Sequence, residues 1–301
     1  MVQLMKRRGG VGFDISTIRP KGCVTANAAR TTDGIESFME RFSNSTREVA
    51  QGGRRGALMI TIDVSHTQIR DFIKIKRNLK KVTGANISIR LSEKFMNAVK
   101  GDTDFTLQWP VNIDNPEMSE SVNARELWDE IIQSAWECAE PGLMFWDNIT
   151  KSTPSDAYAD IGFGSISSNP CSEIVMPPND ACRLLLVNLS SFVDNQFLDN
   201  AKFDWVKFRE VAMQAQRLMD DLVDLEIEKI DTILEKIKND PESDSIKKIE
   251  IDLWNKIREK ALLGRRTGLG ATALADTIAM MGFRYGSDDS IEFVDKLFES
   301  F

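Results

Sequence analysis

The first 150 residues alternate between short apolar runs and stretches with helical spacing, and this alternation most constrains the fold. The runs ALMITIDV (57–64) and NISIRL (86–91) have the composition of buried strands, whereas Ile35, Phe38 and Phe42 recur at the spacing of one helix face. Strands separated by helices predict βαβ units and a mostly parallel sheet. We therefore expect an α/β fold with strands over 11–15, 57–64, 86–91, 104–109 and 142–146, and helices over 35–50, 67–76, 93–99 and 123–139.

The helix starts carry suitable N-caps at Ser92 and Asn123. In parallel sheets, ligands bind on the loops at the strand ends. The candidate binding loops are therefore 18–33, 77–86 and the long stretch after Trp146.

The second half has a different character. Helical periodicity is weak over 150–204, although the apolar run at 184–193 predicts an ordered, buried segment. A long amphipathic helix is expected from Trp205 to about residue 237, and a second helix ends near residue 263. The sequence GRRTGLG (264–270) predicts a helix-ending turn whose basic pair could bridge acidic helix faces, after which the helix resumes over 271–281.

Composition excludes several function classes. The chain has 38 Lys and Arg against 46 Asp and Glu, a net charge of −8, which disfavours a general nucleic-acid binder. No apolar run approaches the ~18 residues of a membrane span. Four Cys without the spacing of a small disulfide scaffold indicate a reduced, cytoplasmic protein. A single His disfavours a multi-His metal site and a His-centred hydrolase, so chemistry would rest on thiols, carboxylates and amides.

The sharpest candidate site is the segment Asn169-Pro170-Cys171-Ser172-Glu173. An amide, a thiol and a carboxylate stand at alternate positions, and in an extended segment such residues face the same side. A carboxylate beside a thiol can accept a proton, and a carboxamide can hold a hydroxyl. The alternative interpretation is an ordinary loop with a buried Cys.

Three further features admit a functional or a structural interpretation. Cys182 could form a redox couple with Cys171, or be a small buried hydrophobe at the start of an apolar strand. The 18–33 loop, with Arg19 and Lys21, suits a phosphate or a solvated surface. The basic 77–86 loop has the same two interpretations.

Together these segments resemble one family, the catalytic subunit of ribonucleotide reductase. The motifs that carry the resemblance occur in the family's order and cover nearly the whole chain: RRGGVGFDISTIRPKG (7–22), REVAQGGRRGALM (47–59), NPCSEI (169–174), DACRLLLVNLSSF (180–192), DDLVDLEIEKI (220–230) and GRRTGLG (264–270). The style of the motifs is most similar to the adenosylcobalamin-dependent class II. The resemblance implies a ten-stranded α/β barrel with a central finger loop, of which residues 1–150 form the first half with the effector loops, 151–204 the finger loop and a redox Cys, and 205–301 a mainly helical part.

The resemblance also implies roles for individual residues. Cys171 would become a thiyl radical, sheltered from water, that abstracts the ribose 3′-hydrogen. Glu173 would take the 3′-hydroxyl proton, Asn169 would bind the ribose hydroxyls, and Cys182 would be one thiol of the reducing pair. The implied substrate-binding residues are Gly10, Ser168, Asn169, Pro170, Cys171, Ser172 and Glu173. The implied effector-binding residues are Arg19, Lys21, Arg77, Lys81 and Asn86, and no metal site is expected.

The implied partners are a ribonucleotide substrate, a deoxynucleotide triphosphate effector, and a thioredoxin- or glutaredoxin-type reductant, with no nucleic acid and no membrane. The resemblance implies a homodimer or a complex with a chain that supplies the rest of the barrel. The second possibility arises because full members are about twice as long or longer. The expected partner of Cys182 is absent, so we expect no turnover by this chain alone. Two alternatives remain: a non-catalytic, effector-binding fragment, and a class I subunit whose radical comes from a separate metal-containing subunit.

Overall fold

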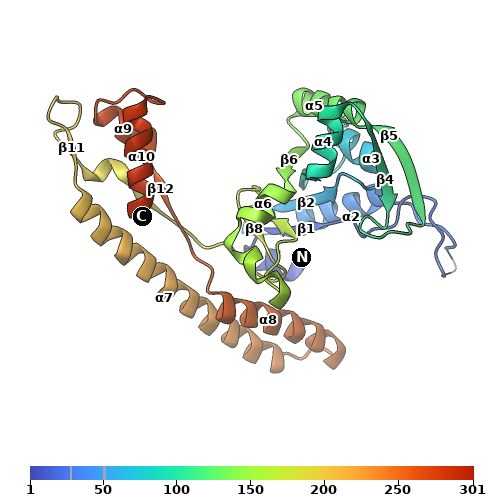
Figure 1. The fold of residues 1–301 in the computed structure, drawn as a ribbon. Helices are drawn as coiled ribbons and strands as arrows, with labels where there is room; N and C mark the ends of the chain where they lie inside the picture. The colour runs from blue at the N-terminus through green and yellow to red at the C-terminus, as the bar shows by residue number, and fades with distance from the viewer. Residues whose placement is uncertain (28, 50–51) are drawn as a thin grey trace. The chain divides into compact units, whose positions relative to one another are not determined.

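The computed structural model describes residues 1–27, 29–49 and 52–301, which form two compact units, 1–178 and 179–301. The boundary falls inside the segment 151–204 that the sequence set apart. Figure 1 shows the helices and strands of each unit. No helix within the described ranges is both long and apolar enough to cross a bilayer.

Unit 1 is built around a four-stranded parallel sheet in the order β1-β2-β3-β6. This confirms the predicted α/β class. The elements are α1 (Val2–Lys6), β1 (Val11–Asp14), α2 (Ile35–Glu48), β2 (Leu58–Asp63), α3 (Ile69–Lys74), the 3-10 helix η1 (Ile75–Arg77), β3 (Asn86–Leu91), α4 (Glu93–Gly101), β4 (Asp104–Trp109), β5 (Met118–Asn123), α5 (Ala124–Cys138), β6 (Gly142–Phe145), α6 (Trp146–Ser152), η2 (Pro154–Ile161), β7 (Ser167–Ser168) and β8 (Val175–Met176).

The helix starts follow from local capping. The side chain of Ser92 accepts a hydrogen bond from the N–H of Phe95 at the start of α4, and Asn123 accepts one from Glu126 at the start of α5. Both predicted caps are confirmed. The predicted end of the first long helix, Ala50, lies outside the described residues.

The parallel sheet has two chemically different faces, because side chains alternate along each strand. One face carries Ile60, Ile62, Ile87 and Ile89, which pack with the helices into the main core. The opposite face carries Gly12 beside Met59, and the polar residues Asp14, Thr61, Asp63, Ser88 and Arg90, which neighbour one another in the strand register. We call this second set the polar face.

β4 does not join the parallel sheet. The strand at 104–109 forms as predicted, but it pairs antiparallel with β5 in a separate two-stranded sheet. The sequence reasoning missed β5, because its residues MSESVN lack the apolar character of a buried strand.

Unit 2 combines two long helices with small sheets. Its elements are β9 (Leu184–Asn188), η3 (Leu189–Phe192), β10 (Val193–Asp194), β11 (Lys202–Phe203), α7 (Trp205–Lys238), α8 (Asp244–Gly264), β12 (Gly268–Thr272), α9 (Leu274–Met280) and α10 (Asp288–Ser300). The two long helices match the prediction. Residues 268–272, expected as turn and helix, instead form a strand parallel to β9, because Gly268 permits a backbone approach in which any Cβ would lie 2.7 Å from the Arg183 carbonyl oxygen.

The basic pair of GRRTGLG joins acidic neighbours inside unit 2. Arg265 donates to Asp220 and Asp224 of α7, each at 2.7 Å. Arg266 donates to Asp180 at 2.5 Å. The structural interpretation of this motif is therefore confirmed.

Candidate active site

The candidate site is a hairpin formed by β7, β8 and the loop 169–174, which we call the Cys171 hairpin. The N–H of Asn169 donates to the carbonyl of Ile174 at 3.0 Å, and the N–H of Ser172 donates to the carbonyl of Asn169 at 3.0 Å. The loop is thus a tight turn, and the predicted extended conformation is wrong. Pro170 fixes the φ angle that the second position of a turn requires, and Ser172 takes the left-handed conformation with φ 72°.

The turn brings the amide and the acid into direct contact. Nδ2 of Asn169 donates to Oε1 of Glu173 at 2.6 Å, and Oδ1 of Asn169 accepts from the N–H of Ile174 at 3.1 Å. Asn169 is buried, whereas Glu173 is exposed. The amide is therefore held in one orientation at the base of the turn, with the carboxylate at the surface beside it.

Cys171 stands at the tip of this turn and is exposed. The expectation that the sulfur is sheltered is thus wrong for the residues that the structure describes. The physical reason is that the turn lies at the end of a short hairpin with two-residue strands, and none of the described residues covers it. The thiol is accessible to a reagent or group from outside the chain.

Two glycines of the GGVG segment allow the chain to pass close to the hairpin. A Cβ on Gly10 would lie 2.5 Å from Cγ of Pro170, and a Cβ on Gly12 would lie 1.7 Å from the Ser168 carbonyl oxygen. Only glycine fits at such distances. Gly10 and the predicted substrate-binding residues 168–173 therefore lie together.

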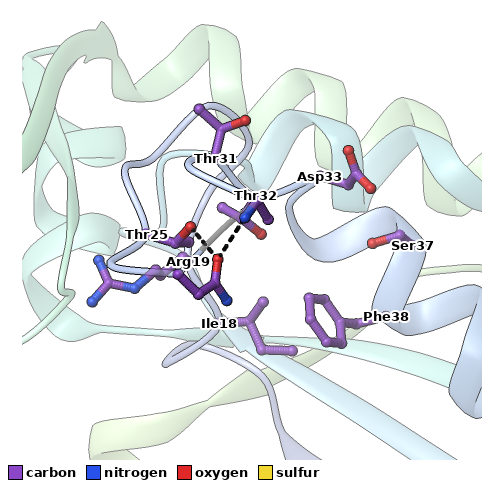
Figure 2. A pocket seen from close by; sticks show the side chains of 10 residues that line it. Ile18, Arg19, Thr25, Thr31, Thr32, Asp33, Ser37 and Phe38 are labelled. Atoms are coloured by element: carbon purple, nitrogen blue, oxygen red, sulfur yellow. Dashed lines mark hydrogen bonds between the residues drawn. The ribbon is translucent and has the colours of Figure 1, made fainter.

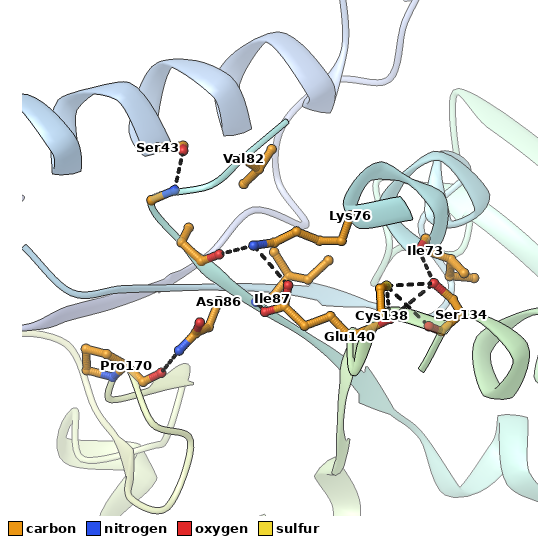
Figure 3. Close-up of polar contacts among 12 residues, drawn as sticks. Ser43, Ile73, Lys76, Val82, Asn86, Ile87, Ser134, Cys138, Glu140 and Pro170 are labelled. Atoms are coloured by element: carbon orange, nitrogen blue, oxygen red, sulfur yellow. Dashed lines mark hydrogen bonds and ion pairs between the residues drawn. The ribbon is translucent and has the colours of Figure 1, made fainter. Parts of the chain in front are cut away.

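The 77–86 loop separates into two parts. Nδ2 of Asn86 donates to the carbonyl of Pro170 at 2.9 Å, so this predicted effector residue touches the Cys171 hairpin (Figure 3). Arg77 pairs with Glu137 at 3.1 Å. Lys81 pairs with Glu36 at 2.9 Å, and this hydrogen bond raises the pKa of Lys81. The side chains of the two basic residues do not meet Asn86 but bind carboxylates of α5 and α2.

Arg19 lines a separate pocket of about 420 Å³ in unit 1, shown in Figure 2. Its guanidinium lies 4.9 Å from the centroid of the Trp109 ring and forms a 3.2 Å ion pair with Glu117. The other lining residues are mostly small and polar, and comprise Ile18, Thr25, Asn27, Ala29, Thr31, Thr32, Asp33, Ser37 and Phe38.

A buried pair holds the loop around this pocket. Oε1 of Gln68 accepts from the N–H groups of Lys21 and Ile35 at 2.9 and 3.1 Å, near the two ends of the loop. Nδ1 of His66 accepts from the N–H of Gln68, and Nε2 lies 3.0 Å from the Ile18 carbonyl oxygen. These contacts fit a neutral imidazole, and burial lowers the pKa of His66.

The remaining cysteines lie away from the turn tip or in the other unit. Cys23 is buried, and its Sγ lies 3.8 Å from Oε2 of Glu117. Cys138 is half-buried beside Ser134 of the same helix (Figure 3). Cys182 is half-buried in unit 2, just before β9, and none of the four cysteines forms a disulfide.

Sequence reasoning missed the polar face beneath the Cys171 hairpin. Asp14, Thr61 and Arg90 are all largely buried and contact one another or the hairpin. The signal was present in the alternation of ITID (60–63) and SIR (88–90), which places polar residues on one face of two neighbouring strands.

Comparison with known proteins identifies the family of the chain. Residues 1–301 match a family model described as ribonucleotide reductase, barrel domain. A vitamin B12-dependent ribonucleoside-diphosphate reductase of Thermoplasma acidophilum is 32% identical over 294 residues, covering 97% of this chain and 34% of that protein. A protein of the same description from Mycobacterium tuberculosis is 30% identical, covering 98% of this chain and 38% of the relative.

A more distant relative is the ribonucleoside-diphosphate reductase large subunit of variola virus, which is 24% identical and matches 99% of this chain and 38% of its own length. The chain therefore spans about a third of the length of these curated relatives. Because the family model matches the chain from its first residue to its last, this chain belongs to the ribonucleotide reductase family, in the part that forms the barrel domain.

Proposed function

We propose that this chain contributes the radical-bearing turn of a ribonucleotide reductase, which converts ribonucleotides to 2′-deoxyribonucleotides. The observation that carries the proposal is the 2.6 Å bond between Asn169 and Glu173, with Cys171 between them at the exposed tip of the turn. An amide, an acid and a thiol within one turn provide a hydroxyl ligand, a proton acceptor and, once the thiol is oxidised to a thiyl radical, a hydrogen-atom acceptor for one sugar.

Each residue has a defined task in this proposal. The Cys171 sulfur, as a radical, takes the 3′-hydrogen atom and later returns it. Glu173 accepts the 3′-hydroxyl proton, and Asn169 orients the hydroxyls. The 2′-hydroxyl leaves as water, and two electrons come from a dithiol that becomes a disulfide. Cys182 is one thiol of that pair, and a thioredoxin- or glutaredoxin-type protein reduces it again.

We propose adenosylcobalamin as the radical source, since two of the relatives are named as vitamin B12-dependent enzymes. The exposed position of Cys171 fits this group, because a cofactor outside the described residues can reach the sulfur. The chemistry that such a cofactor supplies when bound is the one-electron oxidation of a thiol. The chain's own residues then hold the sugar and the proton.

We further propose that the Arg19 pocket binds a deoxynucleotide triphosphate effector. Its small hydroxyl-bearing side chains and one guanidinium suit a deoxyribose and a phosphate. Lys21 lines a neighbouring pocket, where its ammonium can reach a phosphate chain. Asn86 would relay the loop position to the sugar site through its bond to Pro170.

A chimera tests the catalytic proposal. This chain replaces the aligned segment of the Thermoplasma acidophilum protein, and deoxynucleotide formation is measured with and without adenosylcobalamin. Cys171→Ala should abolish turnover, whereas Cys138→Ala, which removes a thiol in α5, should retain it. Formation of deoxynucleotide by the Cys171→Ala chimera would refute the radical role.

The same assay separates the alternatives. Turnover that requires an added metal-containing subunit instead of adenosylcobalamin would identify class I chemistry. Binding of deoxynucleotides by a chimera that never turns over would identify an effector-binding module. The isolated chain is expected to show no turnover.

A further inference from the structure

The Cys171 hairpin has little backbone pairing of its own. Strands β7 and β8 pair over two residues each, and such short hairpins are marginal in isolation. β7 lies against β1 and β2 without joining their sheet. Side chains beneath the hairpin must therefore determine where it stands.

Arg90 links the sheet to the segment that enters the hairpin, in addition to the bond from Asn86 of β3 to the Pro170 carbonyl. Its side chain rises from the polar face of β3, is 11% exposed, and lies 4.7 Å from the centroid of the Trp146 ring. Nε lies 3.2 Å from Oδ2 of Asp14, and Nη2 lies 3.6 Å from Oδ2 of Asp63. Nη1 donates to the carbonyl of Ile166 at 3.2 Å, one residue before β7.

Two hydroxyls provide a second link to the same carboxylate. Oγ1 of Thr61 donates to Oδ2 of Asp14 at 3.0 Å and lies 3.1 Å from Oγ of Ser167 on the hairpin. Asp14 also accepts from the N–H of Ser16 at 3.0 Å. The contacts of Arg90 and of the two hydroxyls therefore converge on one buried acid, Asp14. Burial raises the pKa of Asp14, and the nearby Arg90 guanidinium partly offsets that rise.

We propose that Arg90 is a positioning residue for the Cys171 hairpin, and that Thr61 and Asp14 complete the anchor. The guanidinium suits this task because its planar fork presents several N–H groups in fixed directions. Some of these groups face the two acids, and another faces the carbonyl of Ile166. A lysine ammonium at the same place keeps the charge beside the acids but lacks the second arm toward the hairpin. The importance of this anchor for catalysis rests on the proposed function, whereas the contacts that form the anchor are independent of that function.

Hydrogen exchange of the whole 301-residue chain, read by mass spectrometry, tests the anchor. In Arg90→Lys, the amides over 166–176 should exchange about tenfold faster or more, since a hydrogen bond from a charged donor is lost. The amides of β2 and β3 should keep their protection. Ser167→Ala, which leaves the ion pairs intact, should accelerate the same hairpin amides by a smaller factor.

Arg70→Lys is the matched control, because Arg70 forms a 3.0 Å ion pair with Glu130 away from the hairpin. It should leave residues 166–176 unchanged. Equal acceleration of hairpin and sheet in Arg90→Lys would show a general stabilising role and overturn the proposal. Unchanged hairpin protection in both variants would overturn it too, as would full exposure of these amides in the unsubstituted chain. The readout needs no turnover, so a failure of the Cys171 chemistry leaves its outcome readable.

Discussion

Gly12→Ala should displace the Cys171 hairpin. The added Cβ would lie 1.7 Å from the Ser168 carbonyl oxygen, whereas ordinary contacts are near 3.5 Å, so the two backbones must separate by roughly 1.5–2 Å. β1 is fixed by four registered residue pairs with β2, and the hairpin by two-residue strands. The hairpin should therefore move rather than the sheet.

The expected loss is at the upper end of overpacking costs, about 2–3 kcal/mol, because the neighbour is backbone. For a unit of this size, that lowers the melting temperature by roughly 4–12 °C. In the chimera, turnover should fall about 100-fold, since a misplacement of 1 Å can have that effect. Calorimetry and hydrogen exchange over 166–176 measure the first two consequences.

Gly101→Ala is the control, because its Cβ would meet Thr103 at an ordinary 3.6 Å in the last turn of α4. That variant should be as stable as the unsubstituted chain or slightly more so. A Gly12→Ala chain that melts within about 1 °C of the unsubstituted chain and keeps its hairpin protection would refute the steric reasoning.

Three further predictions concern the residues that hold the 18–33 loop, His66 and Gln68, and an ion pair of helix α7. Burial lowers the pKa of His66, so the neutral imidazole contributes to stability at pH values above its ordinary pKa of about 6.5. As the pH falls below that value, the free energy of unfolding should decrease by up to about 1.4 kcal/mol per pH unit. Urea titrations of His66→Gln should lack this pH dependence. Gln68→Met removes the acceptor that holds the 18–33 loop and should weaken deoxynucleotide binding about tenfold, as measured by calorimetry. An unchanged affinity would contradict the role of Gln68 in holding this loop. Arg265 lowers the pKa of Asp220, so Arg265→Gln should destabilise the chain above pH 4 in low salt, and an equal loss in 1 M NaCl would contradict an exposed ion pair.

Much of the fold follows from the sequence, because burial in a parallel sheet demands apolar runs. The strand over 86–91 and the strand over 104–109 form with the predicted bounds. The strands that were not predicted lack the run of apolar residues that is typical of a buried strand. β5 is a polar, exposed partner of β4, and β12 pairs with β9 through glycines that permit close approach.

The proximity of the residues around Cys171 was predicted correctly, but the backbone conformation that brings them together was not. The residue types around Cys171 indicated an amide and an acid near a thiol, and both neighbours do meet. They meet through a turn, since Pro170 favours a turn as readily as an extended chain. Asn86, expected at the effector loop, contacts the hairpin through a long-range approach that no local pattern encodes.

The alternation of side chains along β2 separates two kinds of consequence within six residues. Substitutions at Leu58, Ile60 and Ile62 disturb the packing against the helices, whereas those at Thr61 and Asp63 disturb the contacts beneath the Cys171 hairpin. In a saturation scan of this strand in the chimera, the effects on abundance and on turnover should therefore alternate with a period of two. Tolerance in one readout would coincide with sensitivity in the other.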